Sequence, residues 1–277
     1  MTHPRFVALA LVCAGLAHPS SGHAEGFDLG VRLNAELGFL AVAAHTIKFS
    51  NSGTNIDYVD EGGQDVLFPY TRWSVDLRLA RHHHLTLLFQ PLEIDAEVRL
   101  KRAVSVDELT FPEGTPTRML YRFPFWRLSY VYDFFAEPET TVAVGGGLQI
   151  RDATITFQSL DGELLRSNRG VGPVPVLAFR ARTPIGDRFW FAGEIEGFYA
   201  PISVLNGSDD EITGAIVDTS VRVGMDLPHG TEAYLNVRYI GGGAVGTDND
   251  HEGPGDGYTK NWLHFITVSL GLSLNLL

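Results

Sequence analysis

Charged side chains recur at every second position in several stretches of this chain, with apolar residues between them. Arg72 and Asp76 belong to one such stretch, and Glu194 and Glu196 stand two residues apart in another. Side chains two apart in a β-strand point to the same face, so each stretch predicts a strand with one charged and one apolar face. Both signs of charge on one face can either pair with each other or line a path for ions.

If the charged faces of several strands meet inside one closed sheet, they form a single network of bases and acids. We assign to this network Arg32, Glu36, Arg72, Asp76, Glu97, Arg122, Arg151, Arg180, Glu194, Glu196, Asp218, Arg222 and Arg238. The bore of a barrel of eight to ten strands is narrow, and side chains largely fill it. Because buried charges must pair, we favour an internal salt-bridge lattice that plugs the lumen over a narrow ion or solute channel.

Two of these assignments depend on prolines. Before Pro91 the apolar residues stand at odd-numbered positions, whereas after it the charged residues, Glu97 among them, stand there. This change predicts a β-bulge that shifts the strand by one residue. Arg122 joins Arg127 on the inward face only if Pro124 shifts the alternation in the same way.

A hydrolytic or lipid-modifying site near the outer rim is the alternative class of function. The acids and histidines near that level are His45, Asp57, Asp60, His251 and His264. A hydrolytic site needs a nucleophile or water, a base within hydrogen-bond reach and an orienting carboxylate. No local motif fixes such a grouping, so we assign no catalytic residue and favour a protein that is not an enzyme.

Two short segments could hold a metal ion. Asp248, Asp250 and Glu252 place oxygen ligands close together, as a calcium loop would, but they lack the spacing of an EF-hand. The three histidines at 82–84 are adjacent, and neighbours in a hairpin point in different directions and rarely share one ion. We interpret the first segment as a solvated acidic loop and the second as a periplasmic turn, and we expect no cofactor.

The last stretch of the chain shows most clearly what positions these residues. From Ile266 to Leu276 alternate residues are apolar, the residues between them are small or polar, and Trp262 opens the stretch. A strand with this pattern over such a length fits the closing stave of an outer-membrane β-barrel, with its apolar face to lipid and its small polar face to the lumen.

Similar segments recur along the chain, with short and long connections alternating between them. The predicted strands are residues 27–39, 66–80, 85–101, 118–135, 141–158, 174–183, 188–200, 214–227, 231–240 and 262–277. We therefore predict an all-β fold, an antiparallel up-and-down transmembrane β-barrel of about ten strands, with eight or twelve as alternatives. The long connections then form external loops.

The first residues have the order of a secretory signal: a basic residue, an apolar run from Phe6 to Ala17, and small residues up to Ala24. We predict a signal peptide at residues 1–24 and a barrel domain at residues 25–277. Cys13, the only cysteine, lies in the signal, so the mature chain has no disulfide or thiol chemistry. The formal net charge of -12 argues against nucleic acid as a partner.

Five segments resemble an uncharacterised family of small Gram-negative outer-membrane β-barrel proteins. They are Phe89–Leu92, Thr110–Pro116, Tyr121–Phe123, Arg151–Ala153 and Trp262–His264. The resemblance implies location and architecture, and it carries over no catalytic residue. One departure is that the chain ends in Leu277, whereas such barrels usually finish with phenylalanine.

Together these patterns give a set of expected partners. We expect a monomer in the Gram-negative outer membrane, inserted by the barrel-assembly machinery and in contact with outer-membrane lipid and lipopolysaccharide. Its expected role is structural, or binding through the external loops.

Overall fold

The computed structural model describes residues 28–276 except 136, 138, 202–210 and 250, so the predicted signal peptide lies outside the described residues. The strands are β1 (Leu29–Phe49), β2 (Ile56–Asp57), β3 (Leu67–Leu79), β4 (His83–Gln90), β5 (Glu93–Arg99), β6 (Val104–Val106), β7 (Leu109–Phe111), β8 (Pro116–Arg122), β9 (Phe125–Asp133), β10 (Thr141–Ser159), β11 (Leu165–Ile185), β12 (Phe189–Pro201), β13 (Thr213–Leu227), β14 (Thr231–Thr247) and β15 (Tyr258–Asn275). A 3-10 turn, η1 (Pro228–Gly230), joins β13 to β14. The described residues contain no helix that is long and apolar enough to cross a membrane.

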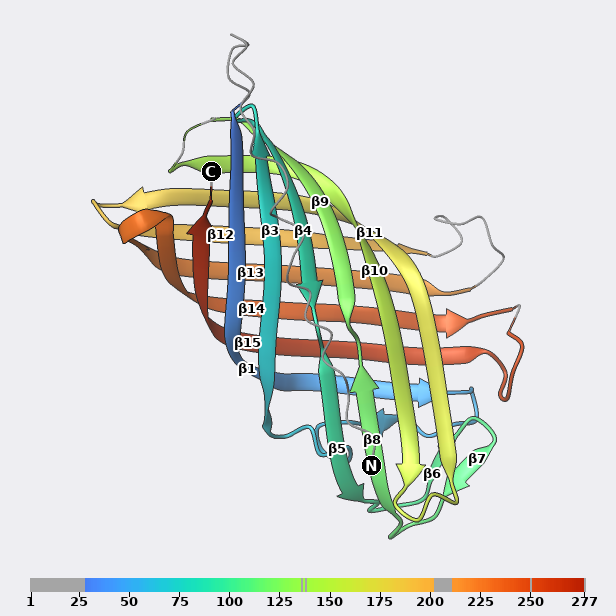
Figure 1. The fold of residues 1–277 in the computed structure, drawn as a ribbon. Coiled ribbons are helices and arrows are strands. Elements are labelled where there is room, and N and C mark those ends of the chain that lie inside the picture. Colours follow the sequence, from blue (N-terminus) through green and yellow to red (C-terminus); the bar gives the residue numbers. More distant parts are fainter. Residues whose placement is uncertain (1–27, 136, 138, 202–210, 250, 277) are drawn as a thin grey trace, which may run out of the picture.

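We call each strand of the barrel wall a stave, and two strands in line count as one interrupted stave. Ten antiparallel staves close into a barrel (Figure 1). The sheet closes because β1 pairs with β3 on one side and with β15 on the other. β4 and β5 form one interrupted stave and β8 and β9 another, because Pro91 and Pro124 fall in the breaks between them. The prediction of an all-β, ten-strand antiparallel barrel is confirmed.

The connections differ in length at the two ends of the barrel. Three of the short turns, residues 80–82, 186–188 and 228–230, lie at one end, and the longer connections, such as 50–66 and 248–257, lie at the other. In outer-membrane barrels the short turns are periplasmic and the long loops are extracellular. We therefore call the end with the long connections the outer end.

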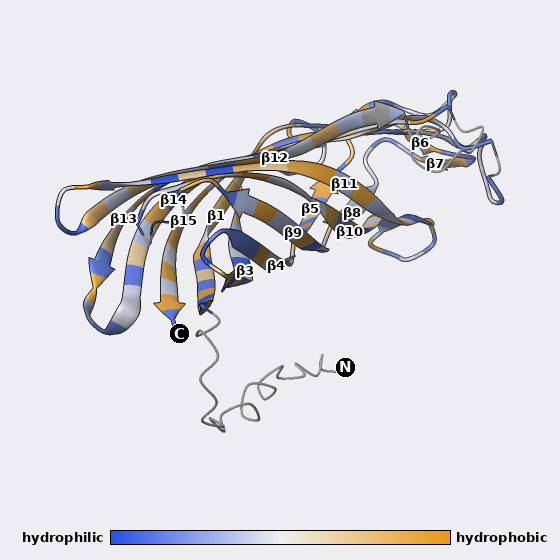
Figure 2. Cartoon of the chain, turned by 90° about the horizontal axis from the view of Figure 1, so that it is seen from above, coloured by the Kyte–Doolittle hydropathy of each residue, from blue (hydrophilic) through white to orange (hydrophobic). Residues whose placement is uncertain are grey.

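Exposed apolar side chains cover the outward face of the staves, and Figure 2 shows the hydropathy alternating along the strands. An aromatic girdle marks the outer limit of this apolar belt. Trp73, Phe89 and Trp126 are in register on neighbouring staves, and the rings of Phe89 and Trp126 stack with their centroids 4.3 Å apart. Tyr132 and Phe134 stand at the opposite limit, at the periplasmic end of β9. This belt has the composition of a lipid-facing surface.

Beyond the outer girdle the outward face of the wall becomes polar and the inward face becomes apolar. On the β4–β5 stave the outward residues change from apolar (Leu85, Leu87 and Phe89) before the break to acidic (Glu93, Asp95 and Glu97) after it. The inward residues are Thr86, Leu88 and Gln90 before the break and the apolar Leu92 and Ile94 after it. Even-numbered residues thus face inward on both sides of Pro91. The predicted phase change is wrong, because the surroundings change from lipid to water while the parity of the strand stays the same.

The outer half of the barrel therefore has an apolar interior. Its buried core includes Leu40, Ile47, Phe49, Ile56, Tyr58, Tyr121, Phe157 and Phe265. A bulge contributes to it: the register of β1 with β15 shifts between Val42 and Ala44, which turns His45 inward together with Ile47 and Phe49. The strands also run farther outward than predicted, with β1 reaching Phe49 and β14 reaching Thr247.

Candidate functional site

The sequence-predicted network residues fall into two groups. Those whose side chains face the interior are Arg32, Glu36, Arg72, Asp76, Arg151, Arg180, Glu194, Glu196, Asp218, Arg222 and Arg238. Glu97 and Arg122 are instead exposed on the outer surface of the extracellular part. Arg122 lies 3.6 Å from Glu93, since neither Pro91 nor Pro124 shifts the alternation. The inward assignment of Glu97 and Arg122 is therefore wrong.

Asp218 of β13 lies at the centre of the inward group. Its carboxylate is 2.5 Å from Nη1 of Arg238, 2.8 Å from Nη1 of Arg127 and 3.4 Å from Nη1 of Arg72. The side chains of Asp218, Arg127 and Arg238 are each only 1% exposed. Three guanidinium groups therefore share one carboxylate in a part of the lumen that holds almost no accessible surface.

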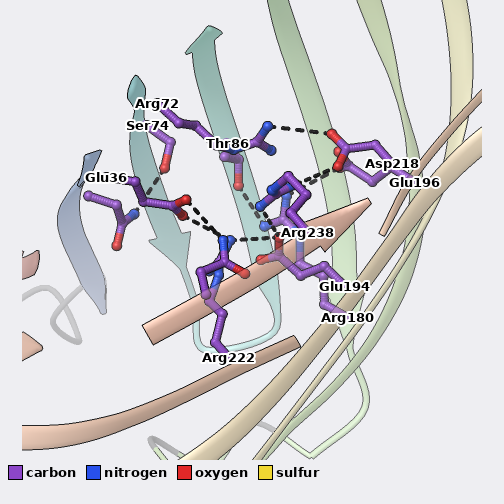
Figure 3. Close-up of polar contacts among 12 residues, drawn as sticks. Glu36, Arg72, Ser74, Thr86, Arg180, Glu194, Glu196, Asp218, Arg222 and Arg238 are labelled. Atoms are coloured by element: carbon purple, nitrogen blue, oxygen red, sulfur yellow. Dashed lines mark hydrogen bonds and ion pairs between the residues drawn. The ribbon is translucent and has the colours of Figure 1, made fainter. Parts of the chain in front are cut away.

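Two further acids balance the remaining arginines (Figure 3). Glu194 accepts a hydrogen bond of 2.8 Å from Arg222, and its carboxylate also lies 3.7 Å from Arg238. Glu196 contacts Arg127 and lies 3.5 Å from Nη2 of Arg180. We call the set Glu36, Arg72, Arg127, Arg180, Glu194, Glu196, Asp218, Arg222 and Arg238 the charge layer.

Neutral polar side chains complete the charge layer. Gln90 accepts a hydrogen bond of 2.8 Å from Arg72, and Gln149 accepts one of 3.0 Å from Nε of Arg127. Glu36 accepts hydrogen bonds from the side chains of Asn236 and Ser269, both at 2.9 Å. The sequence-predicted network contained charged residues alone, although the inward parity of these four neutral residues was an available signal.

A cavity of about 450 Å³ opens on the periplasmic side of the charge layer. Glu232 lies there, 3.1 Å from Arg32 and 2.9 Å from Arg182, and the guanidinium of Arg182 lies over the ring of Trp190 at 4.1 Å. The sequence prediction missed Glu232. This vestibule narrows from open solvent to the fully buried layer above it.

The predicted rim residues are not brought together into a hydrolytic site. His45 is fully buried, with Nδ1 2.8 Å from Oε1 of Gln64 and Nε2 3.1 Å from Oδ1 of Asn261. It lies beyond the lipid-facing part of β1, and burial lowers the pKa of its imidazole. Asp57 accepts a hydrogen bond from the backbone N–H of Val59 within its own loop.

The other rim histidines have separate partners. Nδ1 of His264 is 2.6 Å from the hydroxyl of Tyr239 on the outward face, and Nε2 of His251 is 3.2 Å from the carbonyl oxygen of Pro254. Asp60 is exposed, and its backbone carbonyl accepts a hydrogen bond of 2.9 Å from Lys101. Within this set the backbone N–H of Asp60 donates a hydrogen bond of 3.3 Å to Oδ1 of Asp57, which joins two acids of one loop and no histidine.

The two candidate metal segments differ in what can be said of them. In the loop with Asp248 and Glu252, Asp250 lies outside the described residues. The histidines at 82–84 contact three different groups of two residues: His82 the carbonyl oxygen of Asp133, His83 the hydroxyl of Tyr130 and His84 the carboxylate of Asp133. In the described part of the chain, no group of three or more histidine, cysteine, aspartate or glutamate residues could hold a metal ion.

Comparison with known proteins relates the fold to other barrels. No protein-family model and no curated protein matches the sequence. The outer membrane protease OmpT from Escherichia coli is similar in structure, with a TM-score of 0.54 and 10% identity over 92% of this chain and 99% of that chain. The attachment invasion locus protein Ail of Yersinia pestis has a TM-score of 0.36 and 7% identity over 88% and 99% of the two chains. The Pseudomonas putida toluene transporter TodX has a TM-score of 0.36 and 8% identity over 89% and 90%. This chain has the fold of the Gram-negative outer-membrane β-barrel proteins.

Proposed function

We propose that this chain is an integral protein of the Gram-negative outer membrane, that its lumen is closed to solutes, and that its role is structural or binding. The observation that carries the proposal is that two separate groups of buried side chains occupy the inside of the barrel. The charge layer fills the bore at the level of the lipid, and an apolar core fills it beyond the outer girdle.

The charge layer supports closure because its charges are used within the protein. A path for ions requires charged groups that face water along its length. Here Asp218 and the arginines around it face one another and are almost fully buried. The alternative of a narrow channel lined by both signs of charge therefore has no support from the geometry.

The apolar core supports closure independently. Leu40, Ile47 and Phe265 have no exposed surface, and the loop residues Ile56 and Tyr58 pack into the same cluster. An ion that had passed the charge layer would meet this buried apolar cluster. The extracellular part resembles the interior of a soluble β-protein, which suits a platform that presents loops outward.

Recordings in planar lipid bilayers test the closed lumen. We expect the purified chain to insert without steady current steps, under conditions in which an open porin gives them. Uniform, size-selective steps from the wild-type chain would contradict the proposal. Migration that changes on heating in gels, and extraction that requires detergent, are the expected signs of a membrane-inserted barrel.

A further inference from the structure

The wall of the barrel opens between β11 and β12. β11 pairs with β10 from Leu165 to Arg182, but with β12 only from Leu177 to Ile185. Among the described residues, segment 165–176 therefore has no strand partner on its β12 side. Figure 1 shows β10 and β11 running together away from β12 and β13.

Two prolines lie where β12 leaves β11. Pro173 and Pro175 lack a backbone N–H and are placed in a strand whose other neighbour, β10, is still paired. Proline within sheets is confined to edges and bulges, so the sequence itself specifies an edge at this point. The same prolines oppose pairing with an added strand, which disfavours a peptide as the occupant of the opening.

The opening begins at the outer limit of the apolar belt. Pro173 is in register with Ile150, and Ile150 is in register with Trp126 of the outer girdle. Exposed apolar side chains flank the opening on both strands, with Leu177 68% exposed and Tyr199 71% exposed. It therefore faces the outer leaflet near the level of the lipid headgroups.

A small cavity of about 90 Å³ lies behind the opening. Its apolar lining includes Leu92, Val174, Phe198, Ile216, Ile240 and Leu263, and its polar lining includes Gln149, Arg151 and Asn261. An apolar cavity with few polar groups at one side suits a ligand that has an apolar part and one polar group.

Arg151 differs from the arginines of the charge layer. Each of those has an acid within 4 Å, whereas Arg151 has no hydrogen bond or ion pair with any described residue, and its Nε is buried without a partner. The amide nitrogen of Gln149 is also buried without an acceptor. Two unused donors on one cavity wall predict an acceptor that carries negative charge.

Gly172 leaves room beside this arginine. It stands directly opposite Arg151 on β11, and a Cβ atom at this position would meet nothing within 4 Å. The first atom of a larger side chain at 172 therefore has room, and this position provides a test that leaves Arg151 intact.

We propose that the opening between β11 and β12 binds an amphiphile with one acyl chain and an anionic headgroup. The headgroup accepts hydrogen bonds from Arg151 and Gln149, and the first carbons fill the cavity. A dry cavity of about 150 Å³ holds benzene, so this smaller one cannot enclose a whole chain. The remainder of the chain passes between β11 and β12 into the outer leaflet.

Binding of radiolabelled myristate to the full chain in phosphocholine nanodiscs tests the proposal, with empty nanodiscs as the blank. We expect saturable binding that Arg151→Met weakens by about tenfold or more, through loss of a charge-assisted hydrogen bond. Gly172→Trp should weaken it similarly. The control Arg122→Met removes a charge from the outer surface and should leave the affinity unchanged. Equal affinity of Arg151→Met and the wild-type chain would overturn the proposal.

Competing ligands separate the chemical alternatives. Tetradecanol should compete at least about tenfold more weakly than myristate, because it lacks the charge. Tighter binding of lysophosphatidate than of myristate would identify phosphate as the headgroup within the same proposal. Competition by inorganic phosphate as strong as by lysophosphatidate would contradict the role of the acyl chain.

A stability measurement keeps the test independent of binding. Without ligand, Arg151→Met should raise the thermal unfolding midpoint, because it removes a buried cation that has no partner. A lowered midpoint in a variant that keeps heat-modifiable migration would contradict the unpaired state of Arg151. The proposed binding site is separate from the closed lumen. If the binding result or the stability result failed, the conductance experiment would still test the closed lumen.

Discussion

Replacement of Asp218 by asparagine tests the charge layer most directly. The substitution keeps the size of the side chain and one acceptor oxygen, but it removes the negative charge that three guanidinium groups share. Arg127 retains Glu196, and Arg238 retains Glu194 at 3.7 Å. Arg72 has no other acid within 4 Å among the described ion pairs and keeps only the amide oxygen of Gln90.

The expected loss follows from this unequal compensation. Removing one partner of a buried ion pair destabilises a protein by about 3–5 kcal/mol, because it leaves a buried charge without compensation. We expect Asp218→Asn to lower the free energy of unfolding by this amount. Urea unfolding in lipid vesicles, followed by tryptophan fluorescence, measures it.

An exterior ion pair provides the matched control. Asp95 contacts Arg118 on the outer surface, where the arginine side chain is 48% exposed. Asp95→Asn should reduce stability by about 0–1 kcal/mol. Adding Arg72→Met to Asp218→Asn should recover part of the loss, because it removes the cation left unpaired. If Asp218→Asn and Asp95→Asn had equal small effects, the reasoning about the charge layer would be refuted.

Three other substitutions test the rest of the fold. Leu270→Arg places a charge in the middle of the lipid-facing belt and should reduce the unfolding free energy in vesicles by about 2–4 kcal/mol, whereas no loss would place this face outside lipid. Gly38→Ala brings a Cβ within 2.1 Å of the carbonyl oxygen of Val268 and should reduce stability by about 1–3 kcal/mol in the same assay. The control is Gly170→Ala, where a Cβ meets nothing within 4 Å and which should have little effect. Burial lowers the pKa of His45. Its stabilising contribution is therefore present above the unfolded pKa of about 6.5 and is lost as the pH falls below that value. Hydrogen exchange in the outer part of β1 should accelerate from pH 7.5 to 5 in the wild-type chain and not in His45→Gln. Equal acceleration in both would remove His45 as the cause.

The membrane half of the barrel could be predicted from the sequence because a single physical rule governs it. Lipid on one side and a packed polar lumen on the other require strict alternation, and β15 shows that alternation over its whole lipid-facing length. The inward position of Asp218 and Arg238 followed from parity alone. Which acid meets which arginine did not, since partners such as Arg127 and Asp218 are 91 residues apart in sequence.

The outer half could not be predicted by the same rule. Beyond the girdle the outward residues become polar and the inward ones apolar, so an unchanged strand resembles one that has slipped by a residue. This inversion placed Glu97 and Arg122 on the wrong face. The first part of β11 was missed for another reason: residues 165–173 are mostly polar or glycine and have no apolar face, so the strand was predicted to begin at Val174, close to Leu177, where it gains β12 as its second partner.

The bonds of Glu36 have a consequence for the order of folding. Glu36 lies in the first strand, whereas Asn236 and Ser269, which satisfy its carboxylate, lie 200 and 233 residues farther along the chain. A hairpin of β1 and β3 inserted alone would place Arg72 opposite this acid but would carry it into hydrocarbon without either of these hydrogen-bond donors, at considerable energetic cost. Insertion strand by strand is therefore disfavoured. The barrel is expected to close before the chain enters the bilayer or while it does so.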